Sequence, residues 1–329
     1  MQRQCVVGGC VLGVLAGAGL LVGAIALAHE GHGADALPPF VAPIFNAGLA
    51  GDPALSFDAS GVGLYSWLPL GLLAPGADSA NTCWGYTSPS GREYAIIGVS
   101  TGTVFVEVTD PGDAQVVAVL AGPTSVWRDM KVFGTRCYAV SEGGGGIQVF
   151  DLSLIDSRTV SQVGSVTTGG TQSTHTIFIN EESGYLYRCG GGNTPVMGLR
   201  IYDLNADPVN PPLVGQWNNR YVHETQVVNW TTGPFAGREV AFAFANDSSG
   251  GGTPRVEILD VTNKASITSI AAASYGNAEF CHQGWLSTDR KYLFVDDELD
   301  ESAFSIFSRT RVIDVQNLAA PFEAGTFES

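Results

Sequence analysis

Short apolar runs separated by Gly, Asp, Asn and Pro recur along the chain from Thr82 onward. Examples are YAIIGVS, VFVEVTD and VVAVLAG, with the turn residues Pro89-Ser90-Gly91 before the first of them. Apolar runs of roughly four to eight residues between turn signals are typical of β-strands. The pattern therefore predicts an all-β chain built from many short strands.

The runs group into a unit that repeats at intervals of about 35 to 55 residues, the spacing typical of solenoids and propellers. Each unit holds four predicted strands, and an Asp lies at the end of the third, where it accepts hydrogen bonds from the turn backbone. Four strands per unit describe a β-propeller blade. A β-sandwich with the same number of strands is the alternative, but a sandwich does not require the repetition. The five predicted blades cover residues 82–122, 126–168, 174–219, 222–273 and 281–329, with the recurring acids Asp110, Asp151, Asp203, Asp260 and Asp314.

The start of the chain reads as a targeting signal. Residues 1–28 combine a basic start, an apolar run and an A-x-A cleavage site at Ala26-Leu27-Ala28, which predicts a secretory signal peptide. An uncleaved anchor is the alternative, because the apolar run is long enough to span a bilayer. Residues 29–61 are predicted to be irregular and residues 62–329 to form the propeller. Residues 63–70 predict one strand without a hairpin partner, which we interpret as a closing strand.

Several stretches within the units carry a resemblance to a known family: CWGYTSPSGREYAIIG, WRDMKV, THTIFINEESGYLY, YVHETQVV, GREVAF and CHQGWLSTDRKYLFVDDELDE. With the degenerate LVIVD segments VFVEVTD, VEILDVT and TRVIDV, they make the chain from about Leu64 to Thr326 similar to the choice-of-anchor B family of secreted bacterial LVIVD-repeat β-propellers. The resemblance implies a seven-bladed propeller of which five blades are present, so that the ring is incomplete and the C-terminal blades and sorting signal are lacking. A closed five-bladed ring is the alternative.

The charge balance narrows the choice of partners. The chain has 32 Asp and Glu against 16 Lys and Arg, a net charge of −16. So acidic a surface repels a phosphate backbone, because nucleic-acid binding depends on Lys and Arg that displace counterions. Nucleic acid is therefore excluded as an expected partner.

Polar and aromatic residues recur near the start of the first strand of each unit, where a propeller has its central channel. Imidazole is the commonest metal ligand, so the three histidines in this set are candidates for a metal or small-ligand site, which Asp129 and Glu224 would complete or orient. A polar plug that satisfies the backbone and channel waters is the alternative. The channel-ring candidates are Trp84, Arg128, Asp129, His175, His223, Glu224, His282 and Gln283, and the metal candidates among them are His175, His223 and His282.

A run of carboxylates near the end of the chain is a candidate calcium site. Clustered carboxylates are what Ca²⁺ selects, although the Asp-x-Asp-x-Asp-Gly spacing is absent. A solvated acidic turn is the alternative. The run contains Asp296, Asp297, Glu298, Asp300 and Glu301.

No nucleophile motif accompanies these residues. The one Gly-x-Ser-x-Gly stretch, residues 98–102, lies at a tight turn between two predicted strands and lacks the strand-to-helix turn of a nucleophile elbow, and no Ser or Cys is linked by its spacing to a His and an Asp. The four cysteines that follow the predicted signal are Cys83, Cys137, Cys189 and Cys281. They permit two disulfides or four thiols.

Two functions therefore stay open. The first is a secreted or cell-surface propeller that acts as a non-catalytic binding module for an extracellular protein, a glycan or an envelope component. It would meet a membrane only through an uncleaved signal or a C-terminal anchor. The second is a metal-dependent, hydrolase-like enzyme with Glu224 or Asp129 as its base. Calcium that serves folding alone would fit the first.

Overall fold

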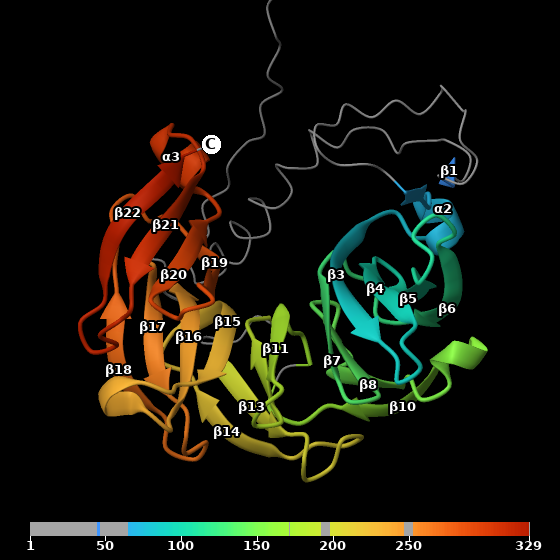
Figure 1. The fold of residues 1–329 in the computed structure, drawn as a ribbon, viewed down its shortest axis with the longest axis horizontal. Coiled ribbons are helices and arrows are strands. Elements are labelled where there is room, and N and C mark those ends of the chain that lie inside the picture. Colours follow the sequence, from blue (N-terminus) through green and yellow to red (C-terminus); the bar gives the residue numbers. More distant parts are fainter. Residues whose placement is uncertain (1–44, 47–64, 171, 192–197, 247–252, 329) are drawn as a thin grey trace, which may run out of the picture. The chain divides into compact units, whose positions relative to one another are not determined.

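Five four-stranded antiparallel sheets make up most of the described chain (Figure 1). The computed structural model describes residues 45–46, 65–170, 172–191, 198–246 and 253–328. These residues belong to one compact unit, Leu37–Ser329, and the separate unit Met1–Ala36 lies outside the described ranges. The predicted signal peptide over residues 1–28 therefore falls outside the described residues, as does the predicted irregular segment over residues 29–61 apart from one two-residue strand.

The four strands of each sheet lie side by side in chain order. Sheet 1 contains β3 (Ala80–Thr87), β4 (Glu93–Val99), β5 (Gly102–Glu107) and β6 (Gln115–Ala121). Sheet 2 contains β7 (Arg128–Phe133), β8 (Arg136–Ser141), β9 (Ile147–Asp151) and β10 (Ser161–Val166). Sheet 3 contains β11 (Thr176–Asn180), β12 (Tyr185–Cys189), β13 (Leu199–Asp203) and β14 (Leu213–Trp217). Sheet 4 contains β15 (Tyr221–Asn229), β16 (Glu239–Asn246), β17 (Arg255–Asp260) and β18 (Thr268–Ala273). Sheet 5 contains β19 (Cys281–Leu286), β20 (Tyr292–Asp297), β21 (Arg309–Asp314) and β22 (Phe322–Glu328).

Short elements precede sheet 1 or connect two strands within a sheet. They are β1 (Phe45–Asn46), β2 (Ser66–Trp67), α2 (Leu70–Leu73), the 3-10 helices η2 (Ile155–Ser157) and η3 (Gly233–Phe235), and α3 (Asp300–Phe304). Among the described residues, no helix has the length and apolar character needed to cross a bilayer.

The strand expected over residues 63–70 differs from its prediction. In the described residues it is only β2, and it pairs antiparallel with β1. Pro69 cannot donate a backbone hydrogen bond, so it ends the extended segment and precedes α2. Leu73 of α2 packs against Val99, Val104 and Val106 of sheet 1. The segment therefore covers an apolar face of sheet 1, which periodicity alone did not show.

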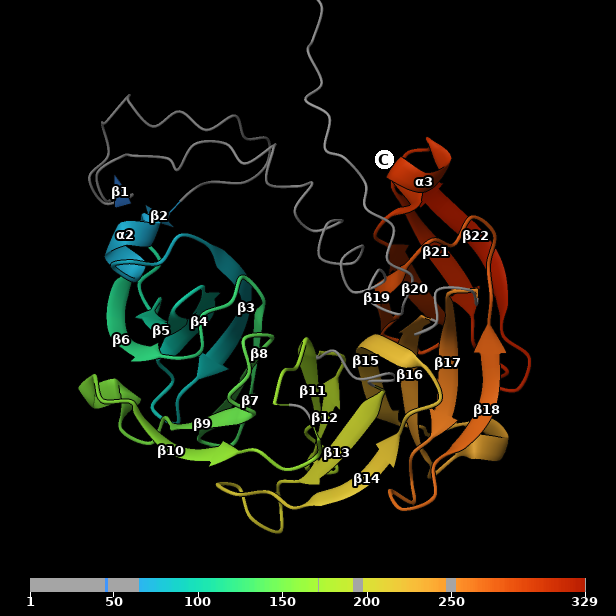
Figure 2. The same cartoon turned by 180° about the vertical axis from the view of Figure 1, so that it is seen from behind.

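The first strand of each sheet adjoins the first strand of the next. Contacts run from β3 to β7, from β7 to β11, from β11 to β15 and from β15 to β19, as both Figure 1 and Figure 2 show. The fourth strand of each sheet lies at the opposite edge. This is the arrangement of blades in a β-propeller, and it confirms the predicted fold class.

Apolar clusters fill the space between consecutive sheets. Four clusters of the described residues each combine side chains of two neighbouring sheets, from sheets 1 and 2 to sheets 4 and 5. Strand β16 is buried along its whole length, with Phe242 and Phe244 facing sheet 5 and Ala241 and Ala243 facing sheet 3. A β-sandwich has one core between two sheets. The repeated interfaces therefore exclude the sandwich alternative.

The recurring Asp of each unit holds a turn. In all five sheets its Oδ1 atom accepts a hydrogen bond from the backbone N–H two residues later, at N···O distances of 2.8–3.0 Å. Asp110 lies three residues beyond the end of β5, and the other four end the third strand of their sheet. The structural role predicted for these acids is confirmed.

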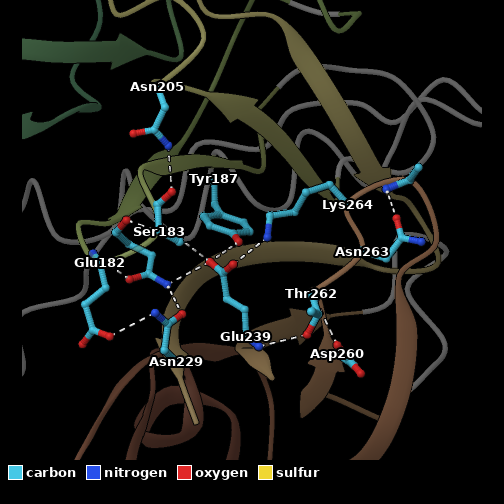
Figure 3. Close-up of polar contacts among 12 residues, drawn as sticks. Glu182, Ser183, Tyr187, Asn205, Asn229, Glu239, Asp260, Thr262, Asn263 and Lys264 are labelled. Carbon is cyan, nitrogen blue, oxygen red and sulfur yellow. Dashed lines mark hydrogen bonds and ion pairs between the residues drawn. The ribbon is translucent and has the colours of Figure 1, made fainter. Parts of the chain in front are cut away.

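A buried carboxylate joins sheets 3 and 4 (Figure 3). Glu239 of β16 is 7% exposed, and its Oε1 atom accepts hydrogen bonds from Asn180 (2.8 Å), Ser183 (2.8 Å) and Tyr187 (2.7 Å). Its Oε2 atom lies 2.5 Å from Nζ of Lys264, which is also buried. Burial of a charge is tolerated when the charge is paired and its remaining lone pairs accept hydrogen bonds. Glu239 therefore links the two sheets.

Replacing Glu239 by Ala should strongly destabilise the protein, because the Lys264 ammonium would remain buried without its partner. We expect a loss of about 3 kcal/mol or more in the free energy of unfolding, measured with urea. The double variant Glu239→Met, Lys264→Met should lose less. The control is Arg238→Ala, which removes the exposed ion pair with Asp260 and should cost less than about 1 kcal/mol. An equal loss in E239A and R238A would contradict the assignment.

Candidate functional site: an imidazole row on the first strands

β-Bulges set two histidines apart from the regular ladder. The pairing of β15 with β16 shifts by one residue around His223, and the pairing of β19 with β20 shifts around His282. Each histidine is thus the extra residue of its strand. A bulge re-aims the side chain that it carries, and bulges are common beside functional sites. The third histidine, His175, directly precedes β11, and its N–H donates to the carbonyl oxygen of Cys189 at 3.0 Å.

The three rings lie in a row across sheets 3, 4 and 5. The ring centroids of His175 and His223 are 4.0 Å apart, and those of His223 and His282 are 4.4 Å apart. Trp127, just before β7, extends the row at 6.1 Å from His175. We call His175, His223 and His282 the imidazole row. It brings together the three histidines that the sequence proposed as metal ligands.

Polar contacts fix the orientation of the rings. Nδ1 of His223 lies 3.0 Å from the carbonyl oxygen of His282. A carbonyl oxygen only accepts, so we assign the proton of the neutral His223 ring to Nδ1 and the lone pair to Nε2. At the two ends of the row, Nδ1 of His175 lies 2.7 Å from Glu142 and Nε2 of His282 lies 3.8 Å from Glu298.

One part of the row has the composition of a metal site. The ligand atoms of His223, His282 and Glu298 all lie within 4.8 Å of one another. Zinc ligands at about 2.0–2.1 Å from the ion are at most about 4 Å apart. Nε2 of His282 and Oε2 of Glu298 are already within that limit at 3.8 Å, and any wider pair of the group would close by less than about 1 Å around an ion.

Glu142 and Glu298 occupy equivalent places in their sheets. Each directly follows the second strand, and each backbone N–H donates to the segment that opens the first strand, Glu142 to Trp127 (3.2 Å) and Glu298 to Phe280 (3.1 Å). Sequence reasoning missed Glu142 and assigned Glu298 to a calcium run. Aligning the units on their second strands, rather than on their first, would have found both.

Asp129 does not belong to the imidazole row. Its Oδ1 atom accepts from Nζ of Lys131 (2.8 Å) and from the N–H of Met130 (2.8 Å), and its Oδ2 atom accepts from the N–H of Ile177 (2.9 Å). Through these hydrogen bonds Asp129 links β7 to β11. The structure therefore gives Asp129 a structural role.

Glu224 follows His223 on β15. Burial and, to a lesser extent, the nearby charge of Asp129 raise the pKa of the Glu224 carboxyl to about 7, against the opposing effects of Lys131 and His175. A carboxyl group with a pKa near neutrality exchanges protons readily near pH 7. Of the two carboxylates predicted beside the histidines, Glu224 is thus the one suited to proton transfer.

Arg128 and Gln283 lie apart from the row. The Arg128 guanidinium is buried and donates to the carbonyl oxygens of Val99 (3.3 Å) and Pro123 (2.6 Å), so that it joins sheets 1 and 2. Its burial lowers the pKa of Arg128 to about 10. Gln283 is exposed on β19. Arg128 therefore has a structural role between two sheets, and the exposure of Gln283 gives no sign of a buried site.

Trp84 was aligned with the wrong position. The bulge of β3 falls on Thr82, whose φ is 54°, so that Thr82 matches His223 and His282 and Trp84 lies two residues further along. There Trp84 packs under Nζ of Lys131, 4.5 Å from its ring centroid. It lines a cavity of about 360 Å³ that receives residues from all five first strands, β3, β7, β11, β15 and β19. We call this space the inner-strand cavity.

The acidic run near the C-terminal end is dispersed. Among the described residues, the group of His, Cys, Asp and Glu side chains close enough to share an ion is His223, His282 and Glu298. The other four carboxylates have separate local partners: Asp296 the hydroxyl of Thr310, Asp297 the N–H of Phe280, Asp300 the guanidinium of Arg311 and Glu301 the hydroxyl of Ser308. These four carboxylates therefore do not belong to the group close enough to share an ion, and Asp300, at 1% exposure, is not solvated as the acidic turn required.

The four described cysteines are thiols. Cys83 is exposed, and Cys137, Cys189 and Cys281 are buried in separate places. Burial raises the pKa of the Cys281 thiol to about 12 and raises the pKa of Cys137 and Cys189 as well. Of the two alternatives that the cysteine count left open, the structure contains the thiols.

The chain matches no family model and no curated protein. Its fold is similar to that of several solved structures. A protein of unknown function from Desulfotomaculum acetoxidans has a TM-score of 0.53 at 14% identity, over 77% of this chain and 71% of that one. Hydrazine synthase from Kuenenia stuttgartiensis has a TM-score of 0.51 at 13% identity, over 76% and 68%. The periplasmic gluconolactonase of Pseudomonas aeruginosa has a TM-score of 0.50 at 11% identity, over 74% and 69%. At such identities the matches establish the β-propeller fold and transfer no activity.

Alkylation should distinguish the cysteines. In the native protein at pH 8, iodoacetamide should label Cys83 and leave Cys137, Cys189 and Cys281 unlabelled, because the thiolate is the nucleophile and burial suppresses it. Peptide mass spectrometry before and after denaturation measures this at each site, with the denatured sample as the control. A disulfide between any two of the four, or rapid native labelling of Cys281, would contradict the structure.

Proposed function

We propose that this protein is a β-propeller that binds a divalent transition-metal ion between sheets 4 and 5 and acts as a non-catalytic binding module. The observation that carries the proposal is the convergence of His223 and His282, both placed by bulges, with Glu298. Two imidazoles and one carboxylate suit zinc, copper or nickel better than calcium, which selects oxygen ligands alone. The contacts of Glu142 with His175, and of the His282 carbonyl with His223, hold the neighbouring rings in place.

The proposal includes the location of the protein and the class of its partner. The residues over 1–28 support export from the cell, so the partner would be an extracellular protein, a glycan or an envelope component. The net charge of −16 opposes contact with nucleic acid. The LVIVD-like segments support membership in the choice-of-anchor B family.

A metal-dependent hydrolase is the second candidate. The observation in its favour is the ligand set itself, because two histidines and one glutamate are also the protein ligands of catalytic zinc sites, which keep a fourth position for water. Bound zinc would supply an activated water. Glu224, which follows His223 along β15 and whose pKa burial raises to about 7, would serve as the base that the sequence proposed.

Metal binding should depend on Glu298 and not on its acidic neighbour. The full chain, freed of metal and then titrated calorimetrically with Zn²⁺, should bind one ion with an affinity that falls at least about tenfold in Glu298→Gln and in His282→Ala. The matched control is Glu301→Gln, which makes the same charge change at a carboxylate bound to Ser308. Equal affinity in E298Q and E301Q would contradict the site.

Turnover separates the two candidate functions. The zinc-loaded protein should bind metal without hydrolysing activated esters or lactones above the background of the His282→Ala variant. The protein would instead be an enzyme if hydrolysis requires zinc, is lost in H282A, and slows as the pH is lowered through about 7. Those results would contradict the non-catalytic binding module. The metal titration above serves as the control for correct loading.

A further inference from the structure

The inner-strand cavity has aromatic walls that the imidazole row does not use. Trp84 of β3, Phe178 of β11 and Trp285 of β19 line it. The ring centroids of Phe178 and Trp285 are 6.0 Å apart with their planes tilted by 58°. Trp285 is 52% exposed. We propose that this cavity binds an organic cation, an ammonium group carrying alkyl substituents.

The faces of aromatic rings attract cations, and the chain already contains one example in this cavity. Nζ of Lys131 lies 4.5 Å from the centroid of the Trp84 ring. The positive charge of Lys131 is compensated by Asp129, whose two oxygens lie 2.8 and 3.0 Å from Nζ. Lys131 therefore adds little positive field to the cavity, and the rings of Phe178 and Trp285 remain as electron-rich walls for a second cation.

Carboxylates border the same cavity. Glu181 and Glu182 follow β11 directly, line the cavity and are exposed. Glu182 accepts a hydrogen bond from the amide of Asn229 at 3.0 Å, and its other carboxylate oxygen lies 3.9 Å from the guanidinium of Arg290, whereas Glu181 makes no ion pair among the described residues. The carboxylates attract a cation at short range, and the net charge of −16 attracts it at long range.

The polar groups of the cavity disfavour a neutral, hydroxyl-rich ligand such as a sugar. Such a ligand needs donors as well as acceptors, and the amide of Asn180 already donates to Glu239 (2.8 Å) and to Asn229 (3.1 Å). The ammonium of Lys131 is committed to Asp129. The space that remains, about 360 Å³, is at the lower end of the range for small-molecule sites, which suits a compact cation.

Choline and its neutral isostere 3,3-dimethylbutan-1-ol test the proposal on the full chain. The two probes have the same shape and differ in charge. Choline should quench tryptophan fluorescence saturably and give a calorimetric binding signal, and the neutral alcohol should bind about tenfold or more weakly. Equal binding of the two, no saturable binding of choline, or saturable binding of glucose without binding of choline would each overturn the proposal.

Variants locate the binding and separate it from the metal site. Trp285→Ala should weaken choline binding about tenfold, and Trp285→Phe should retain most of it because a ring face remains. Glu181→Gln with Glu182→Gln should weaken binding and reduce its dependence on salt. The matched aromatic control is Phe307→Ala, which changes a residue that is 70% exposed and does not line the cavity.

Glu298→Gln should leave choline binding unchanged, so this proposal and the proposed metal function fail or succeed independently. Unchanged choline binding in W285A would place the ligand elsewhere and overturn the proposal.

Discussion

The packing of each sheet face to face against the next is the constraint on which the rest of the structure depends. Strands such as β16 are apolar on both faces, so they are stable only between two neighbours. Large side chains on one face meet small residues on the facing sheet. Phe244, for example, packs where Gly284 of β19 leaves room: a Cβ at Gly284 would lie 2.6 Å from the Phe244 ring. This packing sets the first strands side by side and makes residues that are distant in sequence into neighbours.

β-Bulges on two of the repeated first strands create the candidate metal site. A regular ladder would turn successive residues to opposite faces, whereas the extra residue at His223 and at His282 escapes that alternation. Equivalent bulges on adjoining strands then place their side chains together, and the carboxylate that follows the second strand lies beside them. Further along the same strands, where the alternation is regular again, aromatic and aliphatic residues line the inner-strand cavity. The two sites are thus products of one strand arrangement and have different chemistry.

Much of the fold could be predicted from the sequence, because the turn acids such as Asp151 and Asp260 and the spacing of the apolar runs repeat in every unit. The three histidines were also found, since each stands where a first strand begins. The bulges could not be predicted, because they depend on the register between two strands, and this is why Trp84 was aligned in place of Thr82. The contact partners of the acidic residues could not be predicted from the sequence either. Adjacent carboxylates look alike in sequence, and only the fold directs Glu298 to His282 and Asp297 to the N–H of Phe280.

The convergence of His223, His282 and Glu298 is the central claim, and anomalous X-ray scattering from crystals grown with zinc tests it most directly. Data collected on both sides of the zinc absorption edge reveal the ion without reference to any assumed ligand. The account predicts a peak about 2 Å from a ring nitrogen of His223, a ring nitrogen of His282 and a carboxylate oxygen of Glu298. A peak at other residues only, or first strands β15 and β19 that do not adjoin, would contradict it.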